Sequence, residues 1–146
     1  MKSEPDVFSI DDLKKVKTEM WDGVRNYQAR NFMMKDMKVG DDVLFYHSNA
    51  KPMGVYGTAT IHKEAKPDPT QFDPESKYYD EKSTKENPRW HCVTVKFSSK
   101  FKEPVTLQEI KETEKLAEMK LVQKGQRLSI QPVSIQEFKH ILKMAK

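Results

Sequence analysis

The eleven residues from Trp21 to Asn31 carry the side chains of this sequence best suited to molecular recognition. The segment reads W-D-G-V-R-N-Y-Q-A-R-N and combines two aromatic rings, a glycine, two arginines and two asparagines. Aromatic rings offer flat surfaces, whereas guanidinium and amide groups form planar sets of hydrogen bonds with carboxylates, phosphates or base edges. The segment is therefore either a binding loop that leads into a short helix or a buried aromatic turn capped by solvent-facing arginines.

Three other turns are unusually polar and could complete a pocket with this segment. They are Lys2–Pro5, Tyr46–Asn49 at the end of an apolar run, and Arg127–Pro132 just before the last predicted helix. If these turns meet Trp21–Asn26, they form a pocket with aromatic walls and a ring of donors and acceptors. Such a pocket suits a flat heterocycle, because stacking holds the ring while polar groups read its edge.

Other chemistries find less support in the residues. The four histidines and Cys92 lack the close spacings of zinc sites, and the acids of residues 67–80 lack the glycine-turned pattern of a calcium loop. The sequence contains no G-x-S-x-G motif, and Cys92 falls within a predicted strand rather than at a helix start that would lower its pKa. We therefore expect no metal ion, no cofactor and no catalytic nucleophile.

Length and composition indicate one globular domain. Of 146 residues, 36% are hydrophobic and 33% are charged, and a chain of this length can bury a core. No run approaches the roughly 20 apolar residues of a membrane helix, and the charged start does not resemble a signal peptide. A single cysteine suits a reducing compartment. We expect a cytoplasmic protein, or a nuclear one if the source is eukaryotic, with no membrane partner.

The net charge of +4 is unevenly distributed along the chain. Residues 1–99 contain 16 basic and 16 acidic side chains, whereas residues 100–146 contain 10 and 6. A basic C-terminal part could meet a phosphate backbone, but lysines on solvated helix faces would give the same count. The charge therefore permits nucleic-acid binding without requiring it.

Helix-start signals place four short helices around these turns. Three segments put Ser or Thr three residues before an acid, with apolar residues flanking the cap, and predict helices over 10–17, 107–117 and 135–144. A fourth helix is predicted over 26–35, entered through Asn26.

Three apolar runs predict the strands that hold the turns, over residues 42–48, 54–62 and 89–97. Both alternating faces of the first run are apolar, which predicts a central strand. The inward residues of the other two are predicted to be Val55, Ala59 and Ile61, and Val93, Val95 and Phe97. A proline-containing loop of about 25 residues separates these two strands, and its aromatics Phe72, Tyr78 and Tyr79 predict that it packs against the domain. The pattern predicts an α+β domain with a twisted sheet that closes on itself.

Six motifs together resemble the EVE domain family. They are Lys2–Pro5 (K-S-E-P), Trp21–Phe32 (W-D-G-V-R-N-Y-Q-A-R-N-F), Phe45–Asn49 (F-Y-H-S-N), Pro67–Pro74 (P-D-P-T-Q-F-D-P), Asn87–Trp90 (N-P-R-W) and Arg127–Val133 (R-L-S-I-Q-P-V). They occur in the family's order and cover essentially the whole chain, so that residues 1–146 are read as one EVE domain. The resemblance implies a PUA-like pseudo-barrel of mixed, mostly antiparallel strands, related to the YTH and ASCH domains.

The resemblance also implies a ligand and a site. It implies a module, not an enzyme, that binds DNA or RNA and accepts a modified base, with a modified cytosine as the expected one. Carried over residue by residue, the pocket comprises Ser3, Glu4, Pro5, Trp21, Gly23, Val24, Arg25, Asn26, Tyr46, His47, Ser48, Asn49, Ser129, Ile130 and Gln131. Family members usually carry a few more residues before the K-S-E-P turn, so the first strand is expected to be shortened. Many members are small bacterial proteins, and we expect this chain to be one of them.

In the leading hypothesis, the base of an extruded nucleotide stacks on Trp21 or Tyr46, and Arg25 holds a phosphate or the base. Asn26, Ser48 and Gln131 would read the edge of that base.

Two other functions remain open from the sequence. An enzyme acting on nucleotides or nucleic acid would use Glu4 or His47 as a general base. A protein-interaction or scaffold domain would use Trp21 and Tyr27 as aromatic anchors. The oligomeric state is not determined by these patterns.

Overall fold

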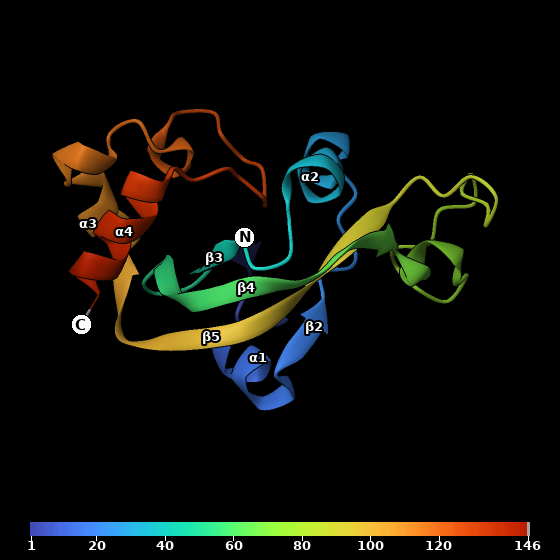
Figure 1. The fold of residues 1–146 in the computed structure, drawn as a ribbon, viewed down its shortest axis with the longest axis horizontal. Coiled ribbons are helices and arrows are strands. Elements are labelled where there is room, and N and C mark those ends of the chain that lie inside the picture. Colours follow the sequence, from blue (N-terminus) through green and yellow to red (C-terminus); the bar gives the residue numbers. More distant parts are fainter. Residues whose placement is uncertain (146) are drawn as a thin grey trace.

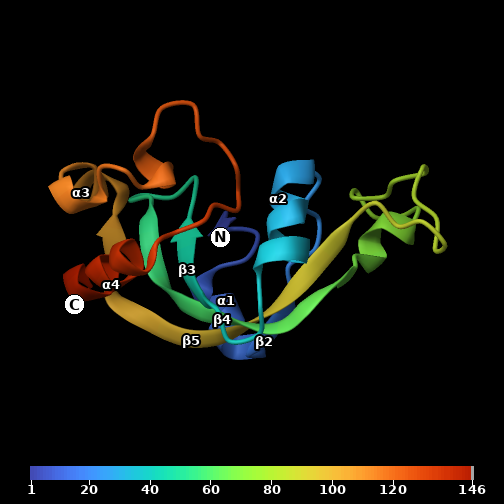
Figure 2. The same cartoon turned by 45° about the horizontal axis from the view of Figure 1, so that its top comes forward.

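A strongly curved sheet of five strands organises the domain. The computed structural model describes residues 1–145. The strands are β1 (Lys2–Ser3), β2 (Thr18–Met20), β3 (Asp42–His47), β4 (Gly54–Pro67) and β5 (His91–Thr106), in the order β1-β3-β4-β5-β2. β1 runs parallel to β3, and the other neighbours are antiparallel. Figures 1 and 2 show β4 and β5 as a long curved ribbon that spans the molecule.

The α+β class and the mostly antiparallel sheet are confirmed, but the predicted closure of the sheet is wrong. β1 and β2 lie at opposite edges, and within residues 1–145 no ladder joins them. These edge strands are only two and three residues long, because each one leads directly into a turn. The sheet is therefore an open, curved surface with its short helices packed around it (Figure 2).

Side-chain caps set the helix starts as predicted. The helices are α1 (Ile10–Val16), α2 (Tyr27–Asn31), α3 (Leu107–Lys111) and α4 (Ile135–Met144). Capping boxes begin α1, α3 and α4. The Asn26 side chain caps α2 by accepting the N–H of Ala29, and α2 continues into a π-turn over Phe32–Asp36. Within residues 1–145, no helix has the length and apolarity needed to cross a membrane.

The predicted helix 107–117 is wrong after its first turns. α3 ends at Lys111, and 3-10 turns follow at Glu114–Leu116 and Lys120–Val122. The break occurs at Thr113, whose backbone is extended and whose hydroxyl donates to the carbonyl of Glu109. Hydroxyl bonds of this kind compete with regular helix formation.

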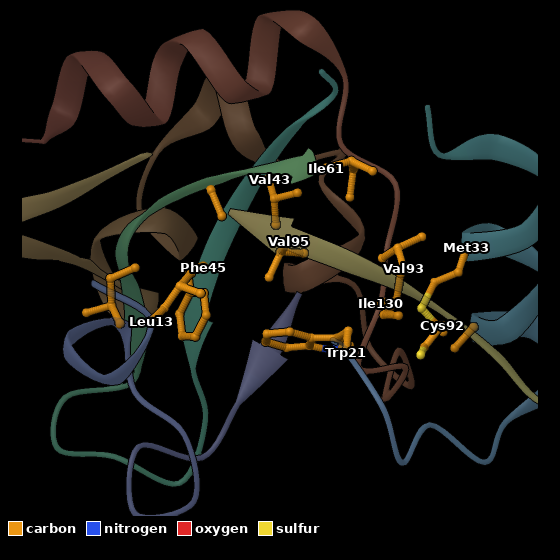
Figure 3. Close-up of a cluster of buried hydrophobic side chains, with 13 residues drawn as sticks. Leu13, Trp21, Met33, Val43, Phe45, Ile61, Cys92, Val93, Val95 and Ile130 are labelled. Atoms are coloured by element: carbon orange, nitrogen blue, oxygen red, sulfur yellow. The ribbon is translucent and has the colours of Figure 1, made fainter. Parts of the chain in front are cut away.

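The two faces of β3 belong to two separate hydrophobic clusters. Val43 and Phe45 lie in the first cluster, which Figure 3 shows, whereas Leu44 and Tyr46 lie in the second. The first cluster joins α1 to the sheet, and the second joins α3 and α4 to it. The prediction that both faces of this strand are buried is therefore confirmed.

β4 and β5 differ from their predicted forms. They cover 54–67 and 91–106 instead of 54–62 and 89–97. Ala59 and Ile61 lie in the first cluster, but Val55 lies in the second. The pairing of β3 with β4 shifts between Phe45–Gly57 and Tyr46–Val55, which leaves Tyr56 as one extra residue in β4. Such an insertion moves the side chains beyond it to the opposite face.

The connection between β4 and β5, residues 68–90, is tied at its base by one buried side chain. The Gln71 amide donates to the carbonyls of Asp68 and Trp90 at 2.8 and 2.7 Å. Its oxygen accepts the N–H groups of Arg89 and Trp90 at 3.1 and 3.0 Å. The prediction that the loop packs down is confirmed for Phe72 and Tyr78, which are partly buried, whereas Tyr79 is exposed.

Replacing Gln71 by Leu should destabilise the domain by about 2 kcal/mol or more, because it leaves the N–H groups of Arg89 and Trp90 without these partners. Urea denaturation measures the change in the free energy of unfolding. Gln136→Leu, on the exposed side of α4, is the matched control and should change it by less than about 0.5 kcal/mol. Equal effects of the two substitutions would contradict this role.

Candidate nucleic-acid interface

The structure brings together the four polar turns that the sequence singled out. The N–H of Ser48 donates to the carbonyl of Ser3 at 2.9 Å, and the N–H of Lys2 donates to the carbonyl of Ser129 at 2.8 Å. β1 therefore lies between the end of β3 and residues 127–132. Trp21 and Ile130 pack in the same cluster, which places the turn Trp21–Asn26 beside them (Figure 3).

Trp21 forms part of the core under this convergence. Its ring contacts Phe8 and Phe45 edge to face, with centroids 6.5 and 5.6 Å apart. Only 9% of the residue remains exposed. The ring can therefore line the floor of a pocket but is not an open stacking surface.

Arg25 is fully engaged inside the protein, and its predicted contact with a phosphate or base is not supported. Nε and Nη2 donate to the carbonyl of Tyr78 at 3.1 and 2.7 Å, and Nη2 also donates to Thr70 Oγ1 at 3.0 Å. Nη1 donates to the carbonyl of Val24 at 3.0 Å and to Asp68 Oδ2 at 3.1 Å. These bonds use all five guanidinium donors. Arg25 therefore anchors the loop 68–90 to the turn that precedes α2.

Asp68 is the acceptor around which this anchor is built. The residue is buried, and its Oδ2 also accepts the N–H of Gly23 at 2.8 Å. Burial alone would raise the pKa of Asp68, but hydrogen bonds from the Thr70 hydroxyl, the Gly23 and Thr70 N–H groups and Arg25 lower it below its ordinary value. The carboxylate is therefore charged at neutral pH and shared between the turn and the loop.

Glycine is required at position 23 because the loop 68–90 lies directly against this residue. Its φ of +81° lies in the left-handed region, and a Cβ here would approach ring atoms of Tyr78 to 2.7 Å. Val24 packs against the first cluster. The backbone of the turn Trp21–Asn26 is thus fitted closely to the loop 68–90.

Tyr46 and His47 do not take the roles predicted for them. The Tyr46 ring lies in the second cluster, on the opposite face of β3 from Phe45 and Trp21. His47 is 5% exposed, its Nε2 accepts the N–H of Ile10 at 3.1 Å, and its ring stacks on Tyr56 at 4.0 Å. Tyr46 therefore does not share a pocket wall with Trp21, and His47 is a structural acceptor with no free Nε2 lone pair for general-base work.

Other predicted site residues keep polar groups near the surface. The Asn26 oxygen caps α2, which leaves its amide N–H groups for a ligand. Ser3 Oγ donates to the carbonyl of Phe8, and the Glu4 carbonyl accepts the N–H groups of Val7 and Phe8 in the turn that contains Pro5. Ser48 is partly buried, and Asn49 is exposed with φ +50°.

A groove borders the Ser129–Gln131 segment. It has a volume of about 750 Å³ and runs between Phe32–Val43 and α4, past Ile130 and Gln131. The amide nitrogen of Gln131 is buried and has no hydrogen-bond partner within the described residues. This groove borders one edge of the converging turns and does not extend to Trp21–Asn26.

The loop residues that shape this interface were missed as site residues by the sequence analysis. Asp68, Tyr78 and Trp90 lie more than 40 positions from Arg25 in the chain. One local signal was available: an Asp directly before a Pro is typical of a capped turn, and Asp68 does cap the 3-10 turn Pro69–Phe72.

The Cys92 thiol is buried. The pKa of the Cys92 thiol is raised to about 12, mainly by burial and to a smaller extent by the negative charges of Asp68 and Asp22. The thiol is therefore protonated at neutral pH and a poor nucleophile. Across residues 1–145, no three His, Cys, Asp or Glu side chains are arranged to hold a metal ion.

This architecture and the converging turns define an α+β domain of the PUA-like class. The model of the EVE domain matches residues 1–144, and the chain belongs to the EVE domain family. The resemblance read from the six motifs is thereby confirmed.

Relatives with known names and structures support the same assignment. Human thymocyte nuclear protein 1 is 43% identical over an alignment of 163 positions, which covers 99% of this chain and 72% of that protein. A crystal structure of the human protein in complex with DNA containing 5-methylcytosine matches with a TM-score of 0.91 and 44% identity, covering 99% of this chain and 94% of that chain. A protein of Pseudomonas syringae matches with a TM-score of 0.94 and 46% identity, covering 99% and 96%.

Arg25→Lys should destabilise the domain by about 2 kcal/mol and expose the loop 68–90, since an ammonium group replaces a planar set of five donors. Urea denaturation and the rate of proteolytic cleavage within residues 68–90 measure the two effects. Arg127→Lys, at an exposed arginine, should change neither. Unchanged stability and cleavage in the Arg25 variant would instead favour a direct role in ligand contact.

Stability should fall as the pH drops below about 6.5, because burial lowers the pKa of His47 in the folded state. The unfolded chain then binds the proton more readily than the folded one. Melting temperatures between pH 7.5 and 5.5 measure this slope. His47→Gln keeps an acceptor for Ile10 but does not titrate, and should reduce the slope. The part that remains reports other groups whose pKa burial lowers, among them His91 and the amino group of Met1. An identical slope in the variant would contradict the assignment.

Proposed function

We propose that this chain is a nucleic-acid-binding module that accepts a modified cytosine. The main support for this proposal is the similarity of the chain, over nearly the whole of both chains, to the human protein crystallised with DNA containing 5-methylcytosine. The chemistry of the converging turns agrees with this ligand. A flat base needs an apolar floor and donors at its edge, and Trp21 and Asn26 offer these beside one another.

The proposed pocket is the space bordered by Trp21–Asn26, the turn after β1, the end of β3 and residues 129–131. In this proposal Trp21 forms the floor, and the Asn26 amide, the Ser48 hydroxyl and the Gln131 amide, whose buried nitrogen is unpaired among the described residues, read the base edge. Arg25 acts indirectly, by fixing the turn through Asp68 and the Tyr78 carbonyl. Arg25 is therefore a positioning residue for the pocket.

The base must leave its stack to enter such a pocket. Extruding a nucleotide from a duplex costs a few kcal/mol, so a single-stranded or weakened site should bind more tightly than an intact duplex. The excess of basic residues in 100–146 adds attraction for the phosphate backbone that falls with increasing salt.

Binding without catalysis is the function that the side chains favour. His47 Nε2 already accepts a hydrogen bond from Ile10, and the Cys92 thiol is buried with a raised pKa. The most reactive side chain types near the turns are thus committed to the core.

Asn26→Ser should weaken binding to a single-stranded oligonucleotide containing one 5-methylcytosine by about ten-fold, since a lost base-edge contact is worth roughly 1–3 kcal/mol. Serine still caps α2, so the fold is retained while the amide donors are removed. Fluorescence anisotropy at two salt concentrations measures the affinity, with matched unmodified DNA and RNA as competitors. Asn87→Ser, in the exposed loop, should have no effect. Equal affinity of the wild-type protein for methylated and unmodified strands would overturn the proposal.

A further inference from the structure

Tyr27 is an exposed aromatic residue held in a fixed orientation beside the proposed pocket. It follows Asn26 directly as the first residue of α2, and 50% of its surface is exposed. Its ring stacks on Trp90, with centroids 4.8 Å apart and planes 19° from parallel. The stack therefore fixes the orientation of a ring that is otherwise half exposed.

Trp90 provides a rigid support for that ring. It is buried, and its indole Nε1 donates to Asp80 Oδ2 at 2.7 Å. The guanidinium carbon of Arg25 lies 5.3 Å from its ring centroid. Arg25, which fixes the turn Trp21–Asn26, therefore also lies beside the Trp90 ring on which Tyr27 rests.

The outer face of Tyr27 is open. The guanidinium carbon of Arg30 lies 4.6 Å from the Tyr27 centroid and 6.0 Å from the Trp90 centroid. Groups on opposite faces of Tyr27 would be separated by about the sum of their distances to it, far more than 6.0 Å. Arg30 and Trp90 thus lie toward the same side of the ring, which leaves the other face to solvent.

Arg30 adds a cation at the edge of this surface. Its Nη1 donates to the carbonyl of Arg89 at 2.7 Å, and Nε and Nη2 donate to Asn31 Oδ1 at 3.2 and 2.8 Å. Among the described residues these bonds use three of its five donors, so two remain for a phosphate. A flat open ring next to a guanidinium with free donors matches a base and its phosphate.

We propose that Tyr27, supported by Trp90, is the stacking platform for the nucleotide adjacent to the modified cytosine. The inference rests on the proposed function and extends it, because it states where the strand runs on leaving the pocket and makes the neighbouring base part of the affinity. Stacking on an aromatic side chain contributes about 1–3 kcal/mol per base, and a ring that is already fixed loses little entropy on binding.

The test combines protein variants with abasic oligonucleotides. Single-stranded DNA with one 5-methylcytosine is prepared with both neighbours intact, or with the 5′ or the 3′ neighbour abasic. For the intact strand, Tyr27→Ala should weaken binding about ten-fold, and Tyr27→Phe should bind like the wild type. One of the two abasic strands should weaken wild-type binding by a similar factor, while Tyr27→Ala binds that strand and the intact strand equally.

Tyr79→Ala is the matched control, because Tyr79 is a similarly exposed tyrosine in the loop 68–90, and it should behave as the wild type throughout. Thermal unfolding of each variant establishes that the fold is retained. One outcome is that the wild type prefers methylated strands while Tyr27→Ala loses the same factor in affinity on intact and abasic strands, or loses no affinity. In that case the stacking role of Tyr27 is wrong, whereas the proposed pocket is still supported. If the wild type shows no preference for methylated strands, the proposed function is wrong, and so is the stacking role of Tyr27 that rests on it.

Discussion

The ion pair between Arg25 and Asp68 is the interaction that joins the turn Trp21–Asn26 to the loop 68–90, and the proposed pocket depends on it. Asp68 is buried, and Arg25 reaches it at 3.1 Å from a turn that is 43 residues away in sequence. Removing Arg25 would leave the buried Asp68 carboxylate without its cation and held only by hydrogen bonds from Gly23 and Thr70. Breaking a buried pair in this way costs more than the pair contributes. The same guanidinium also holds the Tyr78 carbonyl and packs near Trp90. The turn Trp21–Asn26 and the loop 68–90 therefore form one connected unit, which holds the side chains around it in place.

The sheet divides the molecule into two sides with different properties. Trp21 and the converging turns lie with the first cluster, whereas the second cluster carries α3 and α4. β3 belongs to both sides, because its alternating residues face opposite clusters. The residues from 127 to 132 cross from one side to the other and contact β1 on the way. A change in the packing of α4 would thus reach the proposed pocket through Ile130 and Gln131.

Local patterns predicted most of the local structure, and distant contacts explain most of the failures. The caps at Ser9, Thr106 and Ser134 were readable because each motif satisfies its own backbone within four residues. A guanidinium group suits a phosphate or a base, so the sequence suggests that Arg25 contacts a ligand. Nothing near Arg25 in the sequence indicates that it donates to Asp68 instead. The bulge at Tyr56 in β4 depends on pairing with β3, which no pattern within β4 specifies. The break after Lys111 is local, because the Thr113 hydroxyl donates to the Glu109 carbonyl. Reading side chains by type identified the turns that meet, but not which of their polar groups remain free.

The way the loop 68–90 is tied has a consequence for how the family can vary. Gln71 and Asp68 close the loop at its base, and Asp80 holds Trp90. The residues from 81 to 87 lie beyond these ties and are mostly exposed (Figure 1). Lengthening a loop beyond a closed base costs little free energy, since the entropy of closure grows only slowly with length. This tip is therefore a place where evolution can add segments, or an experimenter a fluorescent label, without altering the surface that the base of the loop supports.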